Sequence, residues 1–119
     1  MNGDDTEQRA LACFVLAMCI IASADEAGKD AALRQALHFL RQSETDYRAM
    51  QHLRPLADVQ YIISVVYHNL GMGDEKEAAA TRHHRTEEER GKLEMVAFDE
   101  ETNEVWKTVV DIGVALAKR

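Results

Sequence analysis

The stretch from Val59 to Ala80, VQYIISVVYHNLGMGDEKEAAA, contains the end of one helix and the start of another. Apolar residues at helical spacing lead into Leu70, and glycines follow at positions 71 and 73. Glycine is the residue most often found just past the end of a helix. Asp74, a favoured N-cap residue, then opens a charged, alanine-rich segment. The stretch therefore predicts two antiparallel helices joined at Gly71–Gly73.

An aromatic and a glycine before such a turn, with an alanine after it, is the local pattern of a tetratricopeptide (TPR) hairpin. Hairpins of this kind stack on one another and bind other proteins. The sequence predicts an all-α fold, a TPR-like array of about five to six helices that spans residues 1–119 as one domain. The residues that carry the predicted motif are Ala36, Leu37, Phe39, Leu40, Val59, Tyr61, Tyr67, Leu70, Gly71 and Ala78.

Helical periodicity and turn residues divide the chain into successive elements. The expected elements are a helix from Asp5 or Thr6 to about Ala24, a helix from about Lys29 to Gln42, a turn at Ser43–Asp46, a short or broken helix that carries Tyr47, Met50 and Leu53, a helix from Pro55 to Leu70, a polar helix from Asp74 to Met95, and an amphipathic helix over 99–119. No segment with strand periodicity competes with this assignment.

The first expected helix is apolar on almost every side between Ala10 and Ala22. A helix of that kind is normally covered on more than one side, so we expect it to be buried. The apolar run is shorter than the roughly 18 residues of a membrane helix, and we expect no membrane association. Cys13 and Cys19 point to different sides of this helix, so we expect them to be unpaired core residues in a reducing compartment.

The net charge of −7, from 21 acidic and 14 basic residues, argues against nucleic acid as a partner because an acidic surface repels phosphate. His83 and His84, with acidic residues four positions on, could ligate a metal. The interleaved arginines favour a solvated, salt-bridged face instead. Because the sequence also lacks a phosphate-binding loop and a hydrolase motif, we expect no metal, no cofactor and no catalysis.

The last expected helix carries a continuous apolar stripe that includes the single tryptophan, Trp106. Trp106 can be a core anchor or a contact with a partner protein. Terminal elements of a hairpin array that lack a polar outer face must meet another surface, so we expect contacts with other subunits or self-association. The candidate interface residues are Phe14, Val105, Trp106, Val109, Ile112 and Leu116.

Residues 35–77 resemble the C-terminal TPR segment of the fifth subunit of the anaphase-promoting complex. The matching positions are Ala36, Leu37, Phe39, Leu40, Asp58, Val59, Tyr61, Tyr67, His68, Leu70, Gly71 and Glu75. Members of that family are several times longer, so the chain would correspond to a piece of a longer superhelix. Residues 86–119 extend past the matched region.

The resemblance implies a non-catalytic scaffold in a cell-cycle ubiquitin ligase, with nuclear and cytoplasmic presence and contacts with other large subunits. The alternative function is a stand-alone TPR-type adaptor that binds a peptide or helix in its concave groove. Such a groove is usually lined by Lys, Arg and Asn. The acidic net charge and the apolar helix surfaces favour permanent packing against neighbours instead.

Overall fold

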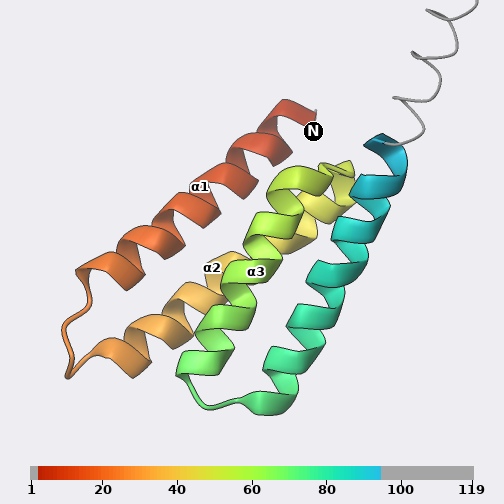
Figure 1. Cartoon of the computed structure of the whole chain (residues 1–119). Helices are drawn as coiled ribbons and strands as arrows, with labels where there is room; N and C mark the ends of the chain where they lie inside the picture. The colour runs from red at the N-terminus through yellow and green to blue at the C-terminus, as the bar shows by residue number, and fades with distance from the viewer. Residues whose placement is uncertain (1–2, 95–119) are drawn as a thin grey trace, which may run out of the picture. The chain divides into compact units, whose positions relative to one another are not determined.

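The computed structural model of the chain describes residues 3–94 (Figure 1). The predicted helix over 99–119 lies outside these residues, as do five of the candidate interface residues, Val105, Trp106, Val109, Ile112 and Leu116. Residues up to Glu87 form one compact unit, and residues from Glu88 onward belong to a second. In that second part, residues 88–94 are helical, and Arg90 Nη1 lies 3.5 Å from Glu94 Oε1, one turn apart.

The described residues form four helices packed as two hairpins. The first hairpin consists of α1 (Gly3–Ser23) and α2 (Lys29–Met50). The second consists of α3 (Leu53–Asn69) and a fourth helix at residues 73–94, coloured cyan to blue in Figure 1. No strand is present in residues 3–94, so the all-α prediction is confirmed there, with four helices in place of five to six.

The predicted turn at Ser43–Asp46 is wrong, because α2 runs without a break from Lys29 to Met50. Polar residues of this kind are common in turns because their side chains bond to nearby backbone. Here two of them bond to α1 instead. Ser43 Oγ donates to the carbonyl oxygen of Ala10 at 2.9 Å, and the Asp46 carboxylate accepts from Arg9. These long-range bonds keep the segment helical.

Two tight turns of the same hydrogen-bond pattern end α2 and α3. After α2, the amides of Gln51 and His52 donate to carbonyls three and five residues back, and Gln51 has φ 56°. After α3, the amides at positions 71 and 72 repeat both bonds, and Gly71 has φ 72°. This is the Schellman pattern, in which a left-handed residue ends the helix. The second turn confirms the predicted hairpin joint, although the fourth helix begins at position 73, before Asp74.

The core lies between α2 and α3 and is completed by small residues from the outer helices. Leu40, Leu56 and Ile63 are fully buried, and Val59 and Val66 are at most 2% exposed. Each of these large apolar side chains contributes about 1.5–3 kcal/mol when removed from water. The outer helices enter this core through alanines, namely Ala10 and Ala17 of α1 and Ala79 of the fourth helix.

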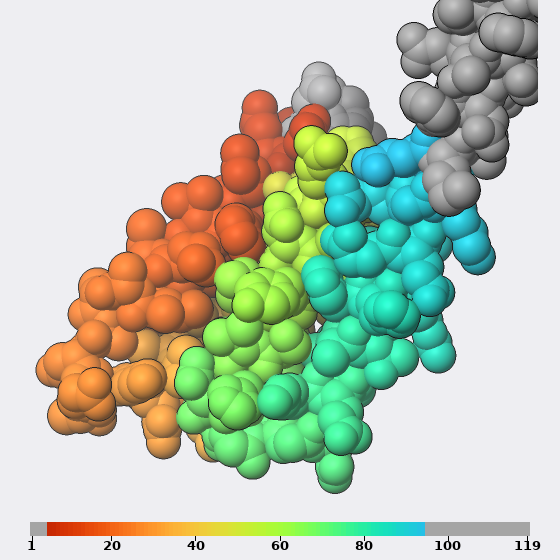
Figure 2. Space-filling view, in the orientation of Figure 1, coloured from red at the N-terminus to blue at the C-terminus, as the bar shows by residue number. Residues whose placement is uncertain are grey.

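Helix α1 packs on α2 along one side, at the outer edge of the packed unit (Figures 1 and 2). Ala10 and Ala17, two turns apart, are both fully buried, and Leu33, Ala36 and Leu40 of α2 lie in the same core cluster. Small side chains at these positions let the two backbones approach closely. Within the described part of the chain, the opposite side of α1 is exposed.

Candidate functional site

The solvent-facing side of α1 is an apolar surface that no other helix covers among the described residues. Its members, which we call the α1 face, are Leu11, Ala12, Val15, Leu16, Met18, Cys19 and Ala22, all of them exposed. Leu11 is 55% exposed, Val15 50% and Leu16 45%. Exposed apolar patches of this kind mark interaction sites on folded proteins. The α1 face is therefore a candidate binding surface.

The α1 face has the spacing of a helix-pairing seam. Leu11, Val15, Met18 and Ala22 follow one another at intervals of four, three and four residues, the spacing of apolar positions in a coiled coil. No charged residue occurs between Arg9 and Asp25. Such a face carries no charge that would repel a second apolar helix.

The expectation that α1 is covered on more than one side is wrong for the described residues. Leu11, Val15 and Cys19 are exposed, and Cys13 is half-buried, so neither cysteine occupies a fully buried position. Phe14, predicted as an interface residue, packs partly buried against the core. Apolarity alone could not reveal this, because a buried helix and a docking helix have the same composition.

Helix α1 is also long and apolar enough to cross a membrane, by length and composition alone, over Asp5–Ser23. The sequence-based estimate was shorter because it counted only the unbroken apolar run. An apolar helix in the interior of a soluble bundle would be mostly buried, whereas only 11% of the most apolar stretch of α1 is buried. This low burial distinguishes α1 from an ordinary core helix. The exposed side of α1 is therefore available to a binding partner.

A partly buried ion pair fixes α1 on α2. Arg9 Nε donates to Asp46 Oδ2 at 2.8 Å, and Arg9 Nη2 donates to Asp46 Oδ1 at 2.7 Å. The side chain of Asp46 is 4% exposed, while that of Arg9 is 50% exposed. The hydrogen bond from Arg9 lowers the pKa of Asp46 against the opposing effect of burial, and a bond from Gln42 at 3.1 Å adds to the lowering. Asp46 therefore stays ionised and holds α1 in place.

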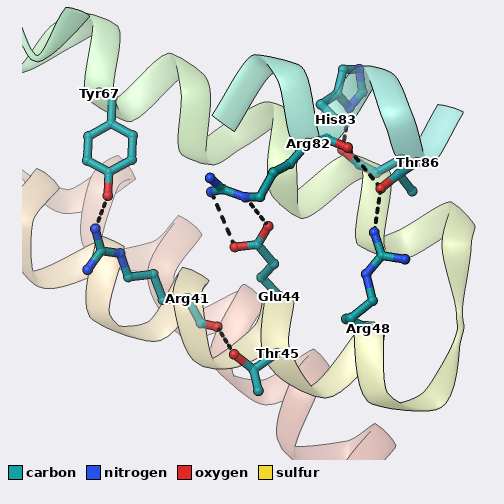
Figure 3. Close-up of polar contacts among 9 residues, drawn as sticks. Arg41, Glu44, Thr45, Arg48, Tyr67, Arg82, His83 and Thr86 are labelled. Atoms are coloured by element: carbon teal, nitrogen blue, oxygen red, sulfur yellow. Dashed lines mark hydrogen bonds and ion pairs between the residues drawn. The ribbon is translucent and has the colours of Figure 1, made fainter. Parts of the chain in front are cut away.

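A second candidate site is a polar groove between α2 and the fourth helix (Figure 3). Arg82 of the fourth helix crosses the groove to Glu44 of α2, with its Nε 2.9 Å from Glu44 Oε2. Arg48 Nη2 donates to Thr86 Oγ1 at 3.2 Å on one side of this bridge. On the other side Arg41 donates to the hydroxyl of Tyr67. The groove is thus lined by three arginines of an acidic protein.

The Glu44–Arg82 bridge lies between two clefts that share Glu44, Thr45 and Arg82 in their walls. The first, which we call the Arg41 cleft, has a volume of about 380 Å³ and is also lined by Arg41, Tyr67, Glu75 and Ala78. The second, which we call the Gln60 cleft, has a volume of about 470 Å³ and is also lined by Arg48, Ala49 and Gln60. Two arginines face two glutamates in the Arg41 cleft, but only one glutamate in the Gln60 cleft.

Gln60 is the unusual residue of the groove. Its side chain belongs to α3 and lies at the wall of the Gln60 cleft, and the residue is 1% exposed. Its Oε1 accepts no hydrogen bond from any residue that the structure describes. A buried acceptor without a donor costs about 1–3 kcal/mol, and native proteins contain few such groups. Gln60 therefore has a buried side-chain oxygen that no described residue satisfies.

The predicted TPR-motif residues are only partly brought together. Ala36, Leu37, Leu40, Val59 and Tyr67 are buried in the common core, whereas Phe39 and Leu70 pack against it half-buried. Two of the motif residues lie outside this core. Tyr61 is 54% exposed, and Ala78 is exposed at the Arg41 cleft while its neighbour Ala79 is fully buried. The helix begins at position 73, before the predicted N-cap.

Within the segment predicted to be a solvated, salt-bridged face, His83 is half-buried. Its Nδ1 lies 2.9 Å from the carbonyl oxygen of Ala57 and so donates to it, and its ring lies 5.7 Å from the ring of Tyr61. His83 therefore links the fourth helix to α3. Across the described residues no group of three or more His, Cys, Asp or Glu side chains is arranged to hold a metal.

In the sequence, only the spacing of two arginines could have indicated the groove. Arg41 and Arg48 are two helical turns apart, but the predicted turn at Ser43–Asp46 placed them on separate elements.

Comparisons with known protein families, curated proteins and solved structures found no match to this chain.

Proposed function

We propose that the chain is a non-catalytic scaffold that joins other protein chains through the α1 face. The observation that carries this proposal is the exposed seam of Leu11, Val15 and Met18 on a helix whose other side is packed on α2. Helices with apolar residues at this spacing bury them against another helix. The occupant we assign to the α1 face is therefore an apolar helix of another protein chain.

A lipid bilayer fits the α1 face less well than a helix does. The charge-free segment covers positions 10–24 and is about 22 Å long at 1.5 Å per residue. The hydrocarbon core of a bilayer is about 30 Å thick. Arg9, at the end of this segment, is also paired with Asp46 of α2. Insertion would break this ion pair and place charged residues in the hydrocarbon.

Within this role we propose that the chain acts as a subunit of the anaphase-promoting complex. The support is the resemblance over residues 35–77, whose buried positions include Leu40, Val59 and Tyr67. The proposed array has a longer unit than a TPR. The second hairpin begins at Leu53, 50 residues after Gly3, whereas TPR hairpins repeat every 34 residues or so.

Self-association tests the α1 face without a known partner, because an uncharged apolar face is complementary to a copy of itself. We expect light scattering to show dimers or larger species between micromolar and near-millimolar concentration. The double variant Leu11→Glu/Val15→Glu should be monomeric with an unchanged helical circular dichroism spectrum, because both side chains are at least half exposed. Ala31→Glu/Gln35→Glu is the matched control, since it adds the same charge at the same spacing on exposed positions of α2.

Three results would contradict the proposal. The first is a monomer at every concentration. The second is loss of self-association in Trp106→Ala but not in Leu11→Glu/Val15→Glu, which would place the contact in the C-terminal segment. The third is flotation of the monomer with phosphatidylcholine vesicles, which would assign the α1 face to lipid.

A further inference from the structure

We propose that a third cleft, beside Arg41, binds a phosphate monoester, as carried by a phosphorylated side chain of another protein or by a small phosphorylated molecule. This cleft, which we call the His38 cleft, has a volume of about 350 Å³. Its walls are formed by Arg34, Leu37, His38, Arg41, Tyr67 and Met72. None of these residues belongs to the α1 face, so this proposal does not depend on the scaffold function.

Three residues of the His38 cleft carry hydrogen-bond donors and come from one face of α2. Arg34, His38 and Arg41 follow one another at intervals of four and three residues, and residues at this spacing are neighbours on a helix surface. All three are exposed, so their donor groups are accessible to a ligand. No Asp or Glu is among the described residues that line the cleft, although the chain has a net charge of −7. The cleft is therefore a cationic site on an acidic protein.

The two arginines of the cleft form no ion pair with any residue that the structure describes. Arg41 Nη2 donates to the hydroxyl of Tyr67, and the Arg41 guanidinium carbon lies 5.8 Å from the centre of the tyrosine ring (Figure 3). Tyr67 lines the cleft, so these contacts hold the guanidinium at its wall. They use one of five N–H donors and leave the charge of Arg41 uncompensated. Glu44, which lines the neighbouring Arg41 cleft, is bonded to Arg82 instead.

A phosphate monoester matches these donors better than other anions do. It carries about 1.5–2 negative charges at pH 7 and has three oxygens that accept hydrogen bonds. The two guanidinium groups supply two positive charges, and the imidazole of His38 donates at least one N–H in any protonation state. A carboxylate or a phosphodiester has a single charge. A nucleic acid would in addition be repelled by the net charge of −7.

Nuclear magnetic resonance of the full ¹⁵N-labelled chain tests the site. We expect glycerol 3-phosphate to shift the Nε–H signals of Arg34 and Arg41 in a saturable way. Dimethyl phosphate and acetate should each bind about tenfold more weakly or worse, because each carries a single charge and loses charge-assisted contacts. A capped peptide with one phosphoserine between alanines separates the two ligand sources. Tighter binding of the peptide than of glycerol 3-phosphate identifies a phosphorylated protein, and equal or weaker binding identifies a small phosphorylated molecule.

Variants separate the cleft from a general effect of charge. Arg34→Gln should weaken the binding of glycerol 3-phosphate by about tenfold or more, because it removes one of the two charged donors. It should leave the denaturation midpoint unchanged, since the Arg34 side chain is exposed and bonds to no described residue, so lost binding cannot be ascribed to unfolding. Arg85→Gln is the matched control, because it removes the same charge from an exposed position outside the cleft.

Three results would overturn the proposal. The first is equal binding of glycerol 3-phosphate and dimethyl phosphate. The second is an equal loss of binding in Arg34→Gln and Arg85→Gln, which would show that net charge alone attracts the ligand. The third is the absence of a saturable shift at Arg34 and Arg41.

Discussion

Arg9 and Asp46 join the first two helices through a pair of parallel hydrogen bonds between residues 37 positions apart. The carboxylate is buried at 4% exposure and the guanidinium is half exposed. Asp46 has a lowered pKa in the folded chain, first because of the hydrogen bond from Arg9. A carboxyl group with a lowered folded pKa stabilises the fold above its unfolded pKa, and this stabilisation is lost as the pH falls through the folded pKa.

Asp46→Asn should therefore destabilise the protein at neutral pH and matter less in acid. We expect a loss of about 1.5–3 kcal/mol at pH 7, the range for hydrogen bonds to charged groups. The difference between parent and variant should shrink below about pH 4, near the unfolded pKa of aspartate. Urea denaturation at several pH values measures this. Asp58→Asn, at an exposed position of α3, is the control, and a parallel loss in both variants would contradict the pairing.

Tyr67 and Leu70 lie on one helix end but should contribute unequally to stability. Tyr67 is 3% exposed and bonded to Arg41, whereas Leu70 is half-buried. We expect Tyr67→Ala to cost about 3–5 kcal/mol and Leu70→Ala about 1–2 kcal/mol, in proportion to the apolar surface lost. Chemical denaturation of both variants decides the order. Equal losses would show that Leu70 is as deeply packed as Tyr67.

Glycine is favoured at both left-handed positions, so Gln51→Gly and Gly71→Ala should change stability in opposite directions. Gln51→Gly should stabilise the protein by about 0.5–1 kcal/mol, because φ 56° is unfavourable for a residue with a Cβ. Gly71→Ala should destabilise it by a similar amount, about 1 kcal/mol, at φ 72°. A Cβ at Gly71 meets no atom within 4 Å, so the cost is one of backbone conformation alone. Thermal denaturation should show midpoints that move in opposite directions.

His83→Ala should cost about 1 kcal/mol, because it removes the hydrogen bond to Ala57 and the contact with Tyr61. Arg85→Ala, two positions along the same helix, should be nearly neutral. Because the lost contacts are between protein groups, a chelator should change neither midpoint. A chelator-dependent midpoint in the parent that disappears in His83→Ala would instead indicate a metal site.

The sequence predicted the second hairpin well because its signals are local. Gly71 supplies the left-handed residue that ends α3, and the charged segment that starts the fourth helix follows at once. Leu56, Val59 and Ile63, which are spaced for one face of a helix, are all buried in the core. Each of these features depends on residues within a few positions of one another.

The errors concern contacts between distant residues. Ser43 and Asp46 suggested a turn because their partners, Ala10 and Arg9, are more than thirty positions away. The open side of α1 could not be predicted, because apolar composition does not tell which neighbour covers a helix. The net charge likewise concealed the arginines of the groove, which come from two different helices.

Within residues 3–87, α2 contacts each of the three other helices. It bonds to α1 through Asp46, shares the core with α3 through Leu40, and reaches the fourth helix through Glu44. Fluctuations that open α2 must therefore disrupt the whole unit, whereas α1 can detach while the other three helices stay packed. Amide hydrogen exchange should follow this hierarchy, with α2 exchanging only through global unfolding and α1 through a smaller opening.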